Sequence, residues 1–191
     1  MLSSFSPSSI VLRPAYADDA PFIAAVVMEA LGNDVMAHLD TVSPDAAIVE
    51  VCRRPDTLYS WQHTHIATFP DGRPAGALVA YRGENYRQMQ QTTFSMLRHL
   101  ITFDIEKMDD ETQTGEYYID SVAVVPESRG MGLGRKLLEH AIACARLEGL
   151  AAVLACDPHN ISARNLYERI GFHVEGHLFI FGEDYLRMVC R

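Results

Sequence analysis

The chain lacks any long apolar run, and this excludes one class of protein. Its 191 residues contain no apolar segment of the length that a membrane-spanning helix needs, so we expect no membrane partner. Residues 1–9 are rich in serine and have neither the basic stretch nor the apolar core of a signal peptide. We therefore expect a flexible N-terminal tail over residues 1–9, one domain over residues 10–191, and a cytoplasmic location.

Cysteine is scarce, and no Cys-x-x-Cys pair occurs, so we expect reduced, buried thiols and neither disulfides nor a metal centre. His63 and His65, and likewise His173 and His177, have a spacing that two metal ligands can use. The first pair has no cysteine or carboxylate nearby to complete a ligand set, and we predict no metal at either pair. The four cysteines are Cys52, Cys144, Cys156 and Cys190.

Positive charge is also in short supply. Lysine and arginine together number 16 against 25 aspartates and glutamates, which gives a formal net charge of −9. A surface that binds nucleic acid needs a basic face to neutralise phosphates, so this charge argues against a nucleic-acid partner. The same charge is compatible with a cationic substrate.

The most informative segment that is present runs from Tyr117 to Gly134. A predicted strand leads into a turn with glycine at 130, 132 and 134, and a helical apolar repeat follows. Glycine lets backbone N–H groups approach a ligand, and the first turn of a helix favours an anion. With Arg129 and Arg135 adding charge, the turn predicts a cradle for phosphate or pyrophosphate.

Two well-known phosphate-binding patterns do not fit this turn. A Walker loop ends in Gly-Lys-Ser or Gly-Lys-Thr, whereas Gly134 is followed by Arg135 and Lys136. The dinucleotide fingerprint requires a glycine at the position of Leu137. Both assignments are therefore excluded.

The stretch Arg129-Gly-Met-Gly-Leu-Gly134 resembles the cofactor-binding motif of the GNAT acetyltransferase family, Arg/Gln-x-x-Gly-x-Gly/Ala. A second family element follows in order, a strand ending at Asp157 and then the stretch from Asn160 to Phe172. Its Asn, Leu-Tyr-Glu and Gly-Phe positions match. Spacing, order and context agree over about residues 116–173, so the resemblance is specific.

The resemblance implies an α/β fold of mixed α+β type, a central mixed, mostly antiparallel sheet of about seven strands flanked by helices. The predicted element order, β-α-α-β-β-α-β-α-β-α-β-β, is similar to that family over nearly the full chain. A serine at 43 and a proline at 44 suit the start of the second helix. We expect strands near 10–13, 63–69, 76–81, 117–125, 152–156, 172–181 and 185–190, and helices near 19–31, 44–54, 84–104, from the glycine turn to 149, and 161–170.

The resemblance also implies roles for single residues in transfer from acetyl-CoA, the expected cosubstrate. A bulge in the strand would free the N–H of Val122 for the thioester carbonyl, and Val124 would pair with the pantetheine arm. Tyr167 would protonate the leaving thiolate, although a core aromatic is the alternative for this residue. The residues expected at the cosubstrate are Val122, Ala123, Val124, Arg129, Gly130, Met131, Gly132, Leu133, Gly134, Arg135, Asn160 and Tyr167.

Acetylation of an amine also needs a base, because an alkylammonium has no lone pair and its pKa is about 10.4. The family places a base on the strand before the glycine turn, where alternation puts Glu116, Tyr118 and Asp120 on one face. We predict Asp120 as the base and Glu116 as the other catalytic candidate. A structural or substrate-binding role is the alternative for Asp120.

We expect direct transfer in a ternary complex to a small, cationic primary amine. Cys156 has no evident base, so a covalent intermediate is disfavoured. The acidic run 104–116 is predicted to be a solvated loop or to line the mouth of the substrate site. Other candidates near the acceptor are Asp34, Tyr59, Trp61, Tyr81, Glu84 and Tyr86.

Several alternatives stay open at this point. The chain is also compatible with a non-catalytic module that binds or senses acyl-CoA, with another acyl group, and with a protein amine as acceptor. A homodimer through the C-terminal strands is a family habit that the sequence itself does not indicate.

Overall fold

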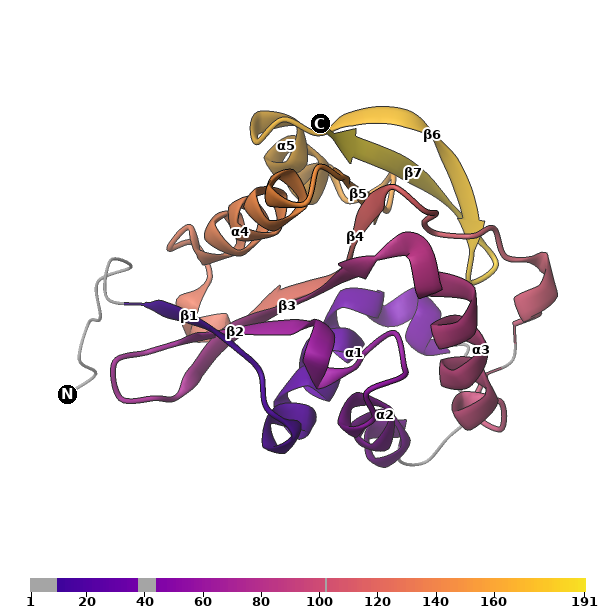
Figure 1. Ribbon diagram of the computed structural model, residues 1–191, viewed down its shortest axis with the longest axis horizontal. Coiled ribbons are helices and arrows are strands. Elements are labelled where there is room, and N and C mark those ends of the chain that lie inside the picture. The colour runs from indigo at the N-terminus through magenta and orange to yellow at the C-terminus, as the bar shows by residue number, and fades with distance from the viewer. Residues whose placement is uncertain (1–9, 38–43, 102) are drawn as a thin grey trace.

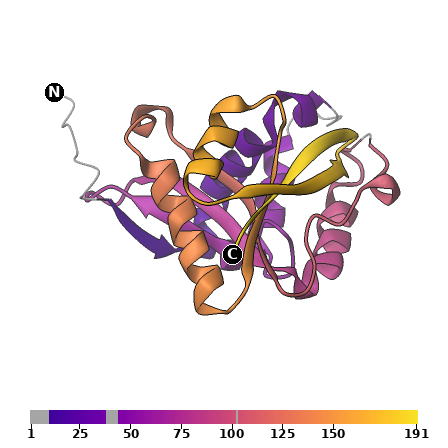
Figure 2. The same cartoon turned by 90° about the horizontal axis from the view of Figure 1, so that it is seen from above.

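Helices cover both faces of one sheet in the computed structural model, which describes residues 10–37, 44–101 and 103–191, without the side chains of 32–37 and 44–45. Figure 1 shows α1, α2 and α3 on one face and α4 and α5 on the other, and Figure 2 shows α4 lying across the strands. The elements are β1 (Val11–Pro14), α1 (Ala20–Ala37), α2 (Pro44–Arg53), β2 (Thr64–Thr68), β3 (Pro74–Arg82), α3 (Tyr86–Leu97), β4 (Glu116–Val124), α4 (Leu133–Leu147), β5 (Ala151–Cys156), α5 (Ile161–Arg169), β6 (His173–Ile180) and β7 (Glu183–Cys190).

The sheet has seven strands in the order β1-β2-β3-β4-β5-β7-β6. Every neighbouring pair is antiparallel except β4 and β5, which are parallel and joined by α4. This confirms the predicted mixed, mostly antiparallel sheet. In the described residues no helix is both long and apolar enough to cross a membrane.

The parallel pair at the centre of the sheet is short. Residues 116–118 of β4 lie opposite residues 151–153 of β5, and the pairing ends there. Beyond Tyr118, β4 continues beside β3 while β5 continues beside β7. The two strands therefore separate, and in the described part of the chain no strand pairs with this edge of β4 over residues 119–124.

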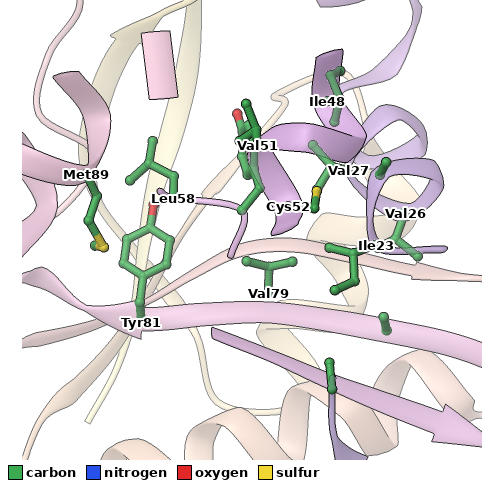
Figure 3. Close-up of a cluster of buried hydrophobic side chains, with 14 of the residues drawn as sticks. Ile23, Val26, Val27, Ile48, Val51, Cys52, Leu58, Val79, Tyr81 and Met89 are labelled. Carbon is green, nitrogen blue, oxygen red and sulfur yellow. The ribbon is translucent and has the colours of Figure 1, made fainter. Parts of the chain in front are cut away.

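Alternation along β3 divides the core into two layers. Val79 and Tyr81 pack with α1, α2 and α3, whereas Leu78 and Ala80 pack with α4 and its neighbours. In Figure 3, the Tyr81 side chain extends from β3 toward Leu58, and its hydroxyl lies next to Leu58. The first layer, as labelled there, includes Ile23, Val26, Val27, Ile48, Val51, Cys52, Leu58, Val79, Tyr81 and Met89.

Two predicted helix ends are wrong. The first helix continues past the expected end near Leu31, because a single glycine inside an apolar repeat is tolerated. The third helix ends at Leu97 and not near residue 104. After it the apolar residues recur every second position, at 101, 103 and 105, and pack against the β6–β7 hairpin, a spacing typical of extended chain. The predicted tail at 1–9 and the cap at Ser43 lie outside the described residues.

All four cysteines are free thiols. Cys52, Cys156 and Cys190 are buried, and Cys144 is partly buried.

Candidate active site

The glycine turn before α4 has the backbone form that an anion cradle needs. Gly130 and Gly132 have φ values of 75° and 79°, in the left-handed region that favours glycine. The N–H of Lys136 donates to the carbonyl of Gly132 at 3.1 Å, so the N–H groups before it have no acceptor inside the helix. A Cβ added at Gly130 or Gly132 would meet no atom within 4 Å. The backbone is therefore open to a ligand.

Arg129 lies beside this turn and contacts α1. Its guanidinium donates to Glu29 Oε1 at 2.8 Å and to the Val124 carbonyl at 3.2 Å. Arg135 instead pairs with Glu139 along the surface of α4, at 2.7 Å. A groove between α1 and the end of β4, which we call the turn-side groove, is lined by Phe22, Ala25, Val26, Glu29, Ala123, Val124, Val125, Pro126 and Arg129.

The bulge expected in β4 is present, and it lies at Asp120. Val79 of β3 is opposite Ser121 and Ala80 is opposite Ile119, so Asp120 is the extra residue. Because of the bulge, Asp120 and its neighbour Ser121 both line one cavity. The use of the Val122 N–H by a ligand stays a prediction.

This cavity, which we call the carboxylate cavity, adjoins the turn-side groove along the same two elements. The groove touches residues 22–29 of α1 and 123–124 of β4, and the cavity touches residues 30–31 and 118–121 of the same elements. The groove and the cavity therefore follow one another along α1 and β4. The lining of the cavity is Ala30, Leu31, Tyr59, Glu111, Tyr118, Asp120, Ser121, Ala155, Ile180, Phe181 and Tyr185.

Glu111 was not singled out from the sequence, yet it is central to the cavity. It is 5% exposed and accepts hydrogen bonds from Tyr118 Oη at 2.7 Å and Tyr86 Oη at 3.1 Å. Nearby, Asp109 exchanges hydrogen bonds with Phe179 of β6, which holds this end of the loop against the sheet. Residues 104, 106, 109 and 110 of the acidic run are exposed, as expected for a solvated loop. The alternative, a loop at the mouth of the substrate site, stays a prediction.

Asp120, like Glu111, is held by hydrogen bonds from neighbouring hydroxyl groups. Its carboxylate accepts hydrogen bonds from Tyr81 Oη at 2.7 Å and from Ser121 Oγ at 2.8 Å. The tyrosines at 59, 81, 86 and 118 are all buried around the two acids. No lysine, arginine or histidine is among the described residues that line the cavity.

Burial changes the acidity of both carboxyl groups. It raises the pKa of Asp120 to about 6, against the effect of the hydrogen bonds from Tyr81 and Ser121. It raises the pKa of Glu111 to about 7, and the nearby charge of Asp120 adds to the shift. The cavity therefore holds a proton near neutral pH unless a cation is bound in it.

Replacing Asp120 by asparagine is expected to stabilise the fold at pH 8 but not at pH 4. The folded pKa lies above the ordinary 3.8, so the folded state holds this proton more tightly than the unfolded state. The resulting penalty is absent below about pH 4, grows as the pH rises and is complete above about pH 6. It amounts to about 3 kcal/mol at roughly 1.4 per pKa unit. Thermal unfolding at both pH values measures it, and an equal gain at both would contradict this cause.

Glu116, the other predicted catalytic carboxylate, lies apart from the cavity. Arg187 of β7 pairs with it, and Thr112 Oγ1 and the backbone and side chain of Gln113 donate to it at 3.1 to 3.2 Å. It belongs to the short stretch of β4 that pairs with β5. These contacts favour a structural role in holding the loop that carries Glu111.

Tyr167 and Asn160 approach from the opposite face of the sheet. Tyr167 packs with the apolar layer that includes Val122 and Val124, and its ring meets Phe172 edge-on at 6.1 Å. Burial raises the pKa of Tyr167 to about 12, so its hydroxyl keeps its proton at neutral pH. Asn160 Oδ1 accepts from the N–H of Ala163 at 3.0 Å and caps α5, a role that the resemblance did not assign.

The structure brings together about half of the acceptor-side candidates. Trp61 packs at the margin of the apolar core and Glu84 is exposed before α3, so neither belongs to the described lining of the cavity. The side chain of Asp34 lies outside the described residues. The candidates that line the cavity or donate to its acids are Tyr59, Tyr81 and Tyr86.

Comparison with known proteins points to one family. A family model described as the acetyltransferase (GNAT) family matches residues 36–172. Over 100 residues, 52% of this chain, the sequence is 42% identical to the mycothiol acetyltransferase of Rhodococcus opacus strain B4, and the match covers 30% of that protein. Over 67 residues, 35% of the chain, it is 36% identical to the 5-NmdU N-acetyltransferase of Pseudomonas phage PaMx11, covering 46% of that protein. The chain thus spans less than half the length of either curated relative.

A solved structure extends the likeness to the whole fold. The N-acetyltransferase of Staphylococcus aureus Mu50 superposes with a TM-score of 0.76, covering 94% of this chain and 99% of that one. The two sequences are 23% identical, so the likeness concerns the fold alone.

Proposed function

The chain belongs to the acetyltransferase (GNAT) family, and from this premise we propose that it moves an acetyl group from acetyl-CoA directly to a primary amine of a small, cationic acceptor. Membership confirms the expected family and, with it, the enzyme class of acyltransferase. One observation carries the proposal. The open glycine turn and the turn-side groove adjoin the buried carboxylate cavity along α1 and β4.

The cradle residues fit the donor. The open N–H groups after Gly130 and Gly132 stand at the positive end of α4, where a pyrophosphate is favoured. Arg129 adds a cation there once its contact with Glu29 is exchanged for phosphate. The unpaired edge of β4 beyond Tyr118 offers backbone partners to a pantetheine arm, in the manner of an added strand.

The cavity residues fit the chemistry of the acceptor. The ammonium gives a proton to the Asp120 carboxylate, and the freed nitrogen lone pair forms a bond to the thioester carbonyl carbon. The carbon–sulfur bond then breaks as the sulfur takes a proton from the Tyr167 hydroxyl. The nitrogen releases its second proton through water, which restores the Tyr167 hydroxyl. Buried thiols offer no competing nucleophile, because burial raises the pKa of Cys156 to about 11 and keeps it protonated.

Release of free thiol from acetyl-CoA, measured against a panel of primary amines, tests the proposal. We expect amine-dependent release, and we expect Tyr167→Phe to lower kcat by about 100-fold because the leaving thiolate loses its proton source. Tyr16→Phe is the matched control, since Tyr16 is 63% exposed in the turn before α1. Tight binding of CoA without thiol release for any amine would contradict the proposal and favour a module that only binds acyl-CoA.

A further inference from the structure

The carboxylate cavity is chemically divided. Glu111 and Asp120 both line this space of about 70 Å³, each held by tyrosine hydroxyls, and we call this part the acidic end. The apolar part of the described lining, which we call the apolar end, includes Ala30, Leu31, Ile180 and Phe181. A space of this size accepts the head of a molecule, namely an amino group and the first carbons that follow it.

The acidic end has more negative charge than its partners balance. The four tyrosine hydroxyls around the two acids are neutral, because burial raises the pKa of each far above neutrality. The thiol of Cys52 is neutral as well, because burial and the nearby charge of Asp120 raise its pKa to about 12. A cationic head is therefore attracted to this end, and a carboxylate attached next to that head is repelled by both acids.

The apolar end is built at a cost in backbone conformation. Phe181 and Gly182 form the two-residue turn between β6 and β7, with φ values of 56° and 87°. Such a turn prefers asparagine or glycine at its first position, because a bulky residue is strained there. The Phe181 ring is nevertheless buried, meets Phe103 at 5.3 Å and closes the cavity wall. Strain of this kind is kept where the side chain has a function.

We propose that the acceptor is a primary alkylamine or arylalkylamine with no carboxylate on the carbon that bears the nitrogen, and that Glu111 sets this choice. This inference rests on the proposed function. The ammonium binds between the two acids, Asp120 receives its proton, and Glu111 keeps a negative charge on the far side. The carbons next to the nitrogen lie against Leu31, Ile180 and Phe181.

Matched acceptors test the substrate class. 2-Phenylethylamine and phenylalanine differ by the carboxylate alone, and so do 3-methylbutylamine and leucine. We expect kcat/KM for each amine to exceed that of its amino acid by about 100-fold or more, because like charges would meet inside the cavity. Phenylalaninamide has the size of phenylalanine but lacks the charge of its carboxylate. We expect its kcat/KM to exceed that of phenylalanine by about 10-fold or more.

The variant Glu111→Gln tests the residue. Glutamine keeps the shape of the side chain and one of the two oxygens that accept separately from Tyr86 and Tyr118, and its amide nitrogen replaces the other oxygen. We expect the ratio of kcat/KM between 2-phenylethylamine and phenylalanine to fall by about 10-fold or more, with acetyl-CoA affinity unchanged in calorimetry. Glu106→Gln, an exposed change in the same loop, should leave the ratio as it is.

The outcomes separate this inference from the proposed function. Amino acids acetylated as well as the amines would overturn the substrate class and leave amine acetylation intact. An unchanged ratio in a folded Glu111→Gln variant would overturn the role of Glu111. Absence of thiol release with every acceptor would overturn the proposed function, and this inference with it.

Discussion

Replacing Asp120 by asparagine is expected to lower kcat by about 10²- to 10⁴-fold, the usual contribution of a positioned base. Asparagine keeps the shape of the side chain and one of the two carboxylate oxygens that accept separately from Tyr81 and Ser121. The amide cannot take a proton from an ammonium, so we expect the chemical step to become slower and kcat to fall. Acetyl-CoA affinity, measured by calorimetry, should not change, because the cradle lies at the other end of the groove.

The pH dependence distinguishes a base from a structural acceptor. The carboxylate must be ionised to act, and its pKa is raised to about 6, so kcat/KM of the natural sequence should fall as the pH decreases through that value. In Asp120→Asn this acid-side fall should disappear along with most of the activity. Asp18→Asn, an exposed aspartate before α1, serves as the control. A variant at 120 that keeps full activity and the same pH profile would show that the base lies elsewhere.

Replacing Gly132 by glutamate is expected to weaken acetyl-CoA binding by about 100-fold or more, because a negative charge would enter the anion cradle. The residue has a φ of 79°, so the new side chain is also strained. Titration calorimetry with CoA measures the loss directly, without any need for the acceptor.

Gly72→Glu is the matched control for backbone strain. Gly72 has a φ of 86° in the turn between β2 and β3, and a Cβ there would also meet no atom within 4 Å. The control shares the strain and the added charge but lies outside the cradle. Equal affinities in the two variants would show that the glycine turn does not hold the pyrophosphate.

The form of the glycine turn that we propose for the cosubstrate could be predicted from the sequence because it is local. Arg129, the alternating glycines and the start of α4 are consecutive, and their geometry follows from short-range rules on glycine and helix ends. The bulge in β4 was also expected, although from the family resemblance and not from the residues. Its place at Asp120 became visible only in the register with β3.

The acceptor side could not be derived in the same way, since four separate segments build it. The end of α1, the loop carrying Glu111, the bulge in β4 and the β6–β7 turn meet only in the folded chain. In the sequence Glu111 is one of several acids in a polar run, and nothing local shows that Tyr86 and Tyr118 bind it. Strand alternation grouped Glu116 with Asp120, but Arg187 reaches Glu116 across the sheet from β7.

The short contact between β4 and β5 makes the sheet two smaller sheets that share a hinge. Among the described residues, the strand pairing between the half containing β3 and the half containing β7 is limited to residues 116–118 and 151–153. The two buried side chains at the end of this pairing, Tyr118 and Val153, therefore pack at the point from which the strands diverge. We expect substitutions that change the volume of either side chain to alter the separation of the strands without changing a residue of the turn-side groove.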